Sequence, residues 1–259
     1  MDNNSLFLYS KTGVKVYLKP ELSPILKGTS LFHPDFTRKA KELFSINTGP
    51  VKGLPKICSE HSEDALTWRY FSPLLEMTRE EKRIWLQIFL EETYRTKPYP
   101  NVAESLAEAE IMFWRGRKAS PFYEPPPNLG YTEGNTEVDL SIQSPKAMIF
   151  VEAKYRSEIA LHTSHSSSRD QIIRNIDVGT YYAWKRGMDF YFILLAPLKS
   201  WKSIERLNLY REDPNKMTER LPHRSDIGNK LEQLTANLGF ITWERLDNLA
   251  LERSGCKRT

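Results

Sequence analysis

Two adjoining segments in which polar and apolar residues alternate constrain the fold of this chain more than any other feature. Residues 137–143 place apolar side chains at every second position, and residues 147–155 continue the same period of two. This alternation is typical of β-strands, whose side chains point to opposite faces in turn. Only a short link around Pro145 and Lys146 separates the segments. So short a link predicts an antiparallel hairpin.

The turn also predicts the register of the hairpin. A turn centred on residues 145–146 places Asp139 opposite Glu152 and Glu137 opposite Lys154. Directly opposed residues lie on the same side of a sheet, with Cβ atoms about 4.5 to 5.5 Å apart. All four polar side chains are therefore expected to point the same way, unless the register slips by one residue.

Two carboxylates so close repel each other unless a positive charge lies beside them. A divalent cation such as Mg²⁺ resolves the conflict, because hard cations prefer carboxylate, water and phosphate oxygens. The alternative is a plain ion pair between Glu137 and Lys154 on a solvated face. Against it, Met148 and Phe150 flank the acid on the same face, where an isolated acid is costly to desolvate.

The rest of the chain alternates helical and strand patterns, which indicates an α/β domain. A β-hairpin is expected in residues 6–18, with Gly13 in its turn. Ser62 is expected to N-cap a helix that runs to about residue 76. The other expected helices are 79–95, 102–112, 169–185 and 226–238, and the other strands are 190–196 and 240–243.

Over about residues 57–245 the sequence resembles the PD-(D/E)xK nuclease superfamily. The signature of that family is an acid on one strand and Glu-x-Lys on the next, here Asp139 in TEVDL followed by Glu152-Ala153-Lys154 in VEAKY. The helical segments SEDALTWRYF before the strands and RDQIIRNIDVGTYYA after them add to the likeness. The resemblance implies a restriction-endonuclease-like mixed β-sheet flanked by helices.

The resemblance also implies roles for individual residues. Asp139, Glu152 and the backbone carbonyl of Ala153 would hold Mg²⁺, for which Mn²⁺ would substitute, and Lys154 would orient the attacking water or stabilise charge on the phosphate. Family members often add an acid from an earlier helix. Here Glu63 is the candidate, with Glu60 and Asp64 as alternatives, since acids in a first helical turn are favoured whatever their function.

Two further types of side chain around this motif suggest contacts with substrate. Gln171 resembles a glutamine that some family members place beside the site, although a helix-surface glutamine is the commoner case. Arg156, Arg169 and Arg174 follow Lys154 in the sequence, where they are expected to contact a phosphate backbone without reading its sequence. DNA is the expected partner, and a homodimer or a larger DNA-processing complex is compatible with the sequence.

The domain organisation follows from these assignments. Residues 1–56 form an N-terminal extension with the β-hairpin appendage, and residues 57–245 form the nuclease-like domain, with a helical insertion at 79–118. A C-terminal tail covers residues 246–259.

Composition is compatible with this interpretation and narrows the class of protein. The 259 residues are 40% hydrophobic and 27% charged, with a net charge of +4, which permits a phosphate-rich partner without requiring one. Two distant cysteines exclude a disulfide scaffold and favour a reducing cytoplasm. The first residues contain neither a signal peptide nor a membrane span.

The expected function is that of a metal-dependent nuclease, an endonuclease acting on DNA. Two alternatives stay open at this stage. One is a catalytically silent nuclease-like module that binds nucleic acid or assists assembly, and the other is a metal enzyme acting on RNA or a nucleotide.

Overall fold

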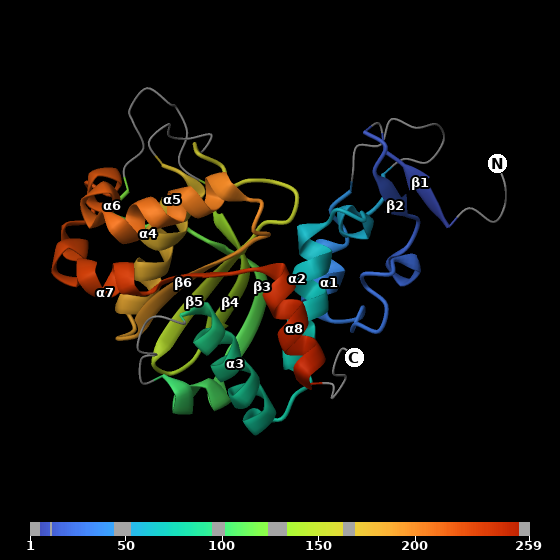
Figure 1. Cartoon of the computed structure of the whole chain (residues 1–259), viewed down its shortest axis with the longest axis horizontal. Helices are drawn as coiled ribbons and strands as arrows, with labels where there is room; N and C mark the ends of the chain where they lie inside the picture. Colours follow the sequence, from blue (N-terminus) through green and yellow to red (C-terminus); the bar gives the residue numbers. More distant parts are fainter. Residues whose placement is uncertain are drawn as a thin grey trace. The chain divides into compact units, whose positions relative to one another are not determined.

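The computed structural model describes residues 6–10, 12–43, 53–94, 102–123, 134–162 and 169–253. The chain divides into two compact units, residues 1–77 and residues 78–259, and Figure 1 follows it from end to end.

The first unit begins with a short β-hairpin. β1 (Phe7–Tyr9) pairs antiparallel with β2 (Lys15–Tyr17), and Gly13 between them has a φ of 76°, a conformation that glycine adopts without steric cost. The hairpin predicted from the sequence is thus confirmed. The elements that follow are η1 (Pro20–Leu22), α1 (Pro34–Lys39), η2 (Lys56–Cys58), α2 (Glu63–Phe71) and η3 (Ser72–Leu75).

Helix α2 begins where the sequence predicts. The Ser62 hydroxyl accepts a hydrogen bond from the backbone N–H of Ala65 at 3.0 Å, so Ser62 is the N-cap. The α-helix ends at Phe71, earlier than predicted, and continues as the 3₁₀-helix η3, since Pro73 has no backbone N–H to donate to an α-helical hydrogen bond.

The second unit is organised around a five-stranded mixed sheet. The strand order is β3-β4-β5-β6-β7; β3, β4 and β5 are antiparallel neighbours, whereas β5, β6 and β7 run parallel. The predicted α/β class is therefore confirmed. The strands are β3 (Glu110–Arg117), β4 (Thr136–Gln143), β5 (Ala147–Ala153), β6 (Asp189–Leu195) and β7 (Leu238–Ile241).

Strand β3 corrects the prediction for residues 102–118. The third predicted helix, 102–112, is a 3₁₀-helix, η4 (Ala103–Glu108), followed by the edge strand of the sheet. Segment 79–118 is therefore not a helical insertion throughout. The strand was not predicted because residues 103–109, just before it, favour a helix. Ile111 and Phe113 of the strand are buried and pair with β4, so tertiary packing outweighs local helix propensity here.

Helices cover both faces of the sheet. α4 (Gln171–Trp184) packs on one face, where Gly179 lies directly against the ring of Phe190. The next residue of β6, Tyr191, points to the other face and contacts Tyr94, which follows α3 (Arg79–Thr93). The alternation along β6 thus places α3 and α4 on opposite sides of the sheet, as Figure 1 shows.

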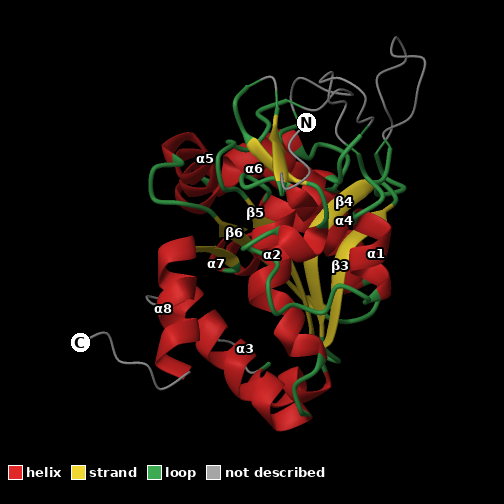
Figure 2. Ribbon diagram, turned by 90° about the vertical axis from the view of Figure 1, so that its right-hand side faces the viewer, coloured by secondary structure: helices red, strands yellow, loops and turns green. Residues whose placement is uncertain are grey.

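The C-terminal part of the second unit is more helical than the sequence suggested. The predicted helix 226–238 is a 3₁₀-helix followed by a short α-helix, and the predicted tail 246–259 contains helix as far as Arg253. Figure 2 shows α8 (Trp243–Arg253) beside α3, and Arg245 forms an ion pair with Glu92 at 2.5 Å. These elements are α5 (Trp201–Glu212), α6 (Pro214–Arg220), η6 (Ser225–Lys230), α7 (Leu231–Ala236) and α8 (Trp243–Arg253).

The core of the second unit fills the space between the sheet and α4 to α7. Met148, Phe150 and Phe192 belong to one buried apolar cluster with Ile173 and Ile176 of α4. Burying side chains of this size stabilises a fold by about 1.5 to 3 kcal/mol each. Within the described ranges, no helix is long and apolar enough to span a lipid bilayer.

Candidate active site

The candidate residues of the second unit lie at one edge of the sheet. β5 and β6 are parallel, so their carboxyl ends meet at Ala153 and Leu195, and antiparallel β4 begins at this same edge. Helix α4 also starts here, close to Glu152. In open α/β sheets, ligands bind outside the carboxyl ends of the parallel strands.

The predicted register of the hairpin is confirmed for residues 140–143. Leu140 pairs with Val151 and Ile142 with Ile149, as a turn at residues 145–146 requires. The pairing of β4 with β5 stops at Leu140 and does not extend to Asp139, the neighbouring residue at the carboxyl edge.

Asp139 sits where the backbone pairing of β4 is interrupted on both sides. Its Oδ2 accepts a hydrogen bond from the backbone N–H of Ala153 at 2.8 Å, in the place of a strand carbonyl. On the other side, pairing with β3 skips Asp139. The residue beside the gap, Trp114, is fully buried and has a φ of 48°. A bulky residue in this left-handed region is strained, and such strain clusters at functional sites.

Glu152 is the most enclosed acid of the site, with 1% of its surface exposed. Its Oε1 accepts hydrogen bonds from Lys154 Nζ at 2.7 Å and from Gln171 Nε2 at 2.5 Å. Its Oε2 accepts one from Asn175 Nδ2 at 3.0 Å. The buried carboxylate is thus compensated by one cation and two amides, as a buried charge requires.

Lys154 is held by its backbone as well as by its side chain. Its N–H donates to the carbonyl of Leu195 at 2.8 Å, and its own carbonyl accepts from Trp243 Nε1 at 2.6 Å. The ammonium group lies on Glu152, and the Lys154 side chain is 9% exposed. Glu137, which the sequence placed opposite Lys154, is exposed and pairs with Gly116 of β3.

The start of α4 brings the side chain of Gln171 to the site. Asp170 N-caps the helix through Ile173 at 2.9 Å, and burial raises the pKa of its carboxyl despite that bond. Gln171, predicted from the sequence, also exchanges hydrogen bonds with the backbone of Ala160 at 3.0 and 3.3 Å. Its side chain is therefore fixed between that loop and Glu152.

Asn175 is a site residue that sequence reasoning missed. It lies one helical turn after Gln171, and the spacing of four residues on a helix that bears a candidate glutamine was the available signal. Asn175 is 1% exposed. Its Oδ1 is buried without a hydrogen-bond partner, which is unusual because most buried polar atoms are paired.

The donor set fits a hard divalent cation. It contains two carboxylates, Asp139 and Glu152, and each carboxylate oxygen has two lone pairs, so the bonds described leave Glu152 with acceptor capacity. The orphaned Oδ1 of Asn175 adds an oxygen at the same place. Among the described residues no three His, Cys, Asp or Glu side chains come together.

Glu63 belongs to the first unit, whereas the other candidates belong to the second. It is the first residue of α2, and its carbonyl accepts a hydrogen bond from Thr67 at 2.9 Å. The competing acid, Asp64, forms an ion pair with Lys39 at 3.7 Å. The role of Glu63 stays a prediction.

The three predicted phosphate-binding arginines have different surroundings. Arg169 is 2% exposed and bound to Asp177 at 3.0 Å; this burial does not favour its predicted contact with nucleic acid, which stays a prediction. Arg174 is partly exposed and donates to the carbonyl of Gly134 at 2.8 Å, just before β4. Arg156 is exposed and keeps the role that the sequence predicts for it.

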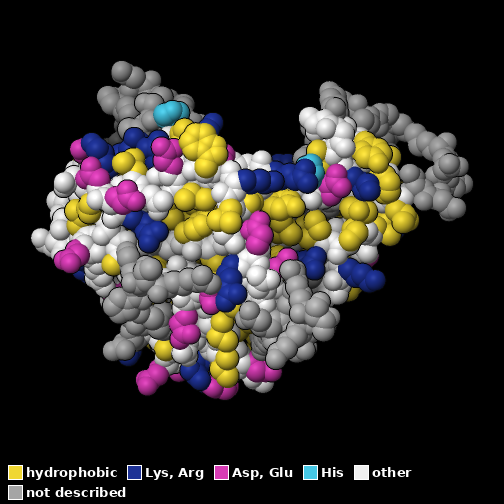
Figure 3. Space-filling view, in the orientation of Figure 1, with side chains coloured by type: hydrophobic (Ala, Val, Ile, Leu, Met, Phe, Trp, Pro, Cys, Tyr) yellow, Lys and Arg dark blue, Asp and Glu magenta, His cyan; other side chains and the backbone are white. Residues whose placement is uncertain are grey.

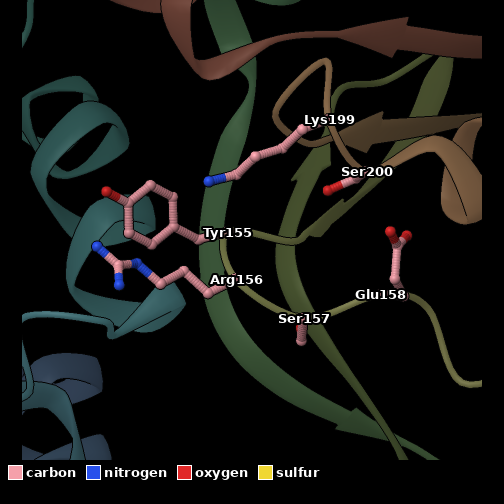
Figure 4. A pocket seen from close by; sticks show the side chains of 6 residues that line it. All are labelled: Tyr155, Arg156, Ser157, Glu158, Lys199 and Ser200. Atoms are coloured by element: carbon pink, nitrogen blue, oxygen red, sulfur yellow. The ribbon is translucent and has the colours of Figure 1, made fainter. Parts of the chain in front are cut away.

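A cavity of about 360 Å³ opens beside the site, directly after Lys154 in the chain. Figure 4 shows the six side chains that line it. They come from the segments that leave β5 and β6 at the same edge of the sheet, and they are Tyr155, Arg156, Ser157, Glu158, Lys199 and Ser200.

Comparisons with models of known protein families, with curated protein sequences and with solved structures found no match.

Proposed function

We propose that this protein is a metal-dependent nuclease that hydrolyses phosphodiester bonds, with DNA as its substrate. The observation that carries the proposal is the buried Glu152–Lys154 pair, 2.7 Å apart, beside Asp139 at the carboxyl edge of the sheet. A buried ion pair seldom adds stability over well-packed apolar residues. Its presence at a ligand-binding edge therefore supports a chemical role.

Each residue of the site has a separate task in the proposed reaction. Asp139, Glu152 and the carbonyl of Ala153 hold Mg²⁺ or Mn²⁺, which supplies Lewis-acid polarisation of the phosphate and a more acidic water. Gln171 and Asn175 fix the Glu152 carboxylate through their amide N–H groups. Lys154 stabilises the negative charge that develops on the phosphoryl oxygens, or orients the water.

Lys154 takes up its task at the phosphate or the water when Glu152 has another positive partner. In the structure its ammonium neutralises Glu152. With a divalent cation held by Asp139 and Glu152, the ammonium of Lys154 would be available to the phosphate. The Glu152 carboxylate would thus have a positive partner both with and without the cation.

The test is incubation of the purified protein with supercoiled, linear and single-stranded DNA and with RNA. Each substrate is offered with Mg²⁺, Mn²⁺ or EDTA. The proposal expects DNA cleavage with either metal and none in EDTA. Cleavage of RNA but not DNA would show that the substrate is RNA. DNA binding without cleavage under any condition would favour a catalytically silent module instead.

A further inference from the structure

The strongest unassigned feature of the second unit is the cavity of about 360 Å³ beside the candidate active site. Arg156 follows β5 and Lys199 follows β6. Both residues therefore lie beyond the edge of the sheet at which Glu152 and Lys154 are found. In Figure 4 the side chains of Tyr155, Arg156 and Lys199 extend in the same direction from their segments. The cavity therefore presents two positive groups together.

Neither of these two cations forms an ion pair with a carboxylate in the part of the chain that the structure describes. Arg156 and Lys199 are both exposed, and Arg156 makes a cation–π contact with Tyr155 at 5.7 Å. The acid of the cavity wall, Glu158, is hydrogen-bonded to Ser203 instead. Its Oε2 accepts hydrogen bonds from the backbone N–H of Ser203, at 2.9 Å, and from the Ser203 hydroxyl.

Over much of the face shown in Figure 3, Lys and Arg side chains are interspersed with Asp and Glu, and a group of Lys and Arg lies at its upper centre. Where charges of both signs alternate, binding of a polyanion depends more on individual cations placed near the reacting bond.

We propose that Arg156 and Lys199 form a binding site for the phosphodiester backbone of DNA next to the bond that is cleaved. The planar guanidinium of Arg156 suits two phosphate oxygens at once, and the ammonium of Lys199 acts as a point charge. The inference rests on the proposed nuclease function for the identity of the ligand. It adds Lys199, which sequence reasoning did not single out.

The experiment measures binding apart from cleavage. Fluorescence anisotropy with a labelled DNA duplex, in EDTA and over a range of salt concentrations, compares wild type with R156Q/K199Q. The matched control is K146Q/R186Q, one exposed lysine and one exposed arginine at the opposite end of the sheet, where Arg186 bonds to Gln143. Circular dichroism checks that all three proteins are folded.

We expect R156Q/K199Q to bind the duplex more weakly, with the slope of log K against log salt reduced by about 0.9 for each lost contact. The control should bind like wild type. In a cleavage assay the double variant should raise KM more than it lowers kcat. Inorganic phosphate, at constant ionic strength, should compete with the duplex for wild type more than for the double variant.

The outcomes separate this inference from the nuclease proposal. If wild type shows the expected difference in binding but never cleaves, the phosphate site stands and the catalytic proposal fails. If wild type cleaves DNA but R156Q/K199Q binds it with unchanged affinity and salt slope, the phosphate site is overturned and the catalytic proposal stands. Equal losses in the control variant also overturn the site.

Discussion

At the scale of single residues, Glu152 and Lys154 depend on each other. Both are almost fully buried, so each is the main charge compensation of the other. Removing one partner of a buried pair costs about 3 to 5 kcal/mol, whereas replacing both by neutral residues is often harmless. The sequence suggested instead that repulsion between Asp139 and Glu152 dominates without a metal, but the structure places a lysine on Glu152.

The Lys154→Met variant should therefore lower the free energy of unfolding by about 3 to 5 kcal/mol in EDTA. The double variant Glu152→Gln/Lys154→Met should recover most of this loss, because Asn175 can rotate its amide so that Oδ1 accepts from the new Gln. Urea denaturation measures both. A Lys154→Met protein as stable as wild type would show that Glu152 is not held as a buried carboxylate by this lysine.

The sequence predicted the residues of this site that belong to a strand pattern, but not the partners from elsewhere in the fold. The alternation of residues 137–155 was sufficient to place Asp139, Glu152 and Lys154 on neighbouring strands. The burial of Arg169 was not foreseen, because its partner Asp177 lies eight residues away on a helix face that only tertiary packing makes internal.

At the scale of elements, the position of α4 on the sheet decides where Gln171 and Asn175 point. This packing depends on a glycine. A Cβ added to Gly179 would lie 2.0 Å from Cε2 of Phe190, whose ring is buried in the core. The helix and the strand must therefore move apart if any larger residue replaces this glycine.

The Gly179→Ala variant should be less stable by about 1 to 3 kcal/mol through overpacking, although alanine favours helices. It should also lose cleavage activity, because the shift of α4 withdraws its amides from Glu152. Gly228→Ala is the matched control, since a Cβ there meets nothing within 4 Å. Thermal unfolding and cleavage rates measure both effects; equal behaviour of the two variants would contradict the packing argument.

Helix α2 provides a second prediction at this scale. If Glu63 is the helix acid of the active site, Glu63→Gln should reduce cleavage far more than Asp64→Asn, because Asp64 is engaged with Lys39. The comparison uses kcat with plasmid DNA at saturating Mg²⁺. A reversed order of severity would assign the role to Asp64.

Elements with strong periodicity were predictable and the others were not. The hairpin, α3, α4 and β6 carry a clear period of two, a helical period or a bounded apolar run. β3 was missed because its strand pattern follows directly on a helix-forming stretch. α5 was missed because Trp201 and Leu198, beside its start, are exposed, so that apolar residues there do not mark a core face.

At the scale of the whole molecule, a buried charge network ties α4 to the segment before η6. Asp177 is fully buried and contacts Arg169 at 3.0 Å, Arg224 at 2.8 Å and His223 at 2.8 Å. Burial alone would raise the pKa of Asp177, but the bonds from His223 and Arg224 and the charge of Arg169 outweigh it, and the pKa is lowered.

This network should contribute to acid sensitivity. A carboxyl whose pKa is lowered by folding adds stability above its ordinary value of 3.8, and this stability is lost as the pH falls through the lowered pKa. Asp177→Asn should cost about 3 to 5 kcal/mol near neutral pH. The difference in Tm between wild type and variant should shrink below about pH 4. A difference that stays constant across this range would contradict the assignment.

The proposed nuclease activity depends on Asp139, Glu152 and Lys154 together with a divalent cation. Its most direct test is the rate of nicking of supercoiled DNA by wild type and Glu152→Gln, purified identically, in Mg²⁺ and in EDTA. Glu110→Gln, which removes an exposed acid from β3, is the control. We expect nicking by wild type and by the control in Mg²⁺ alone, and a loss of at least about 100-fold in Glu152→Gln, the order expected for removing an essential catalytic group. Equal nicking by Glu152→Gln and wild type would contradict it.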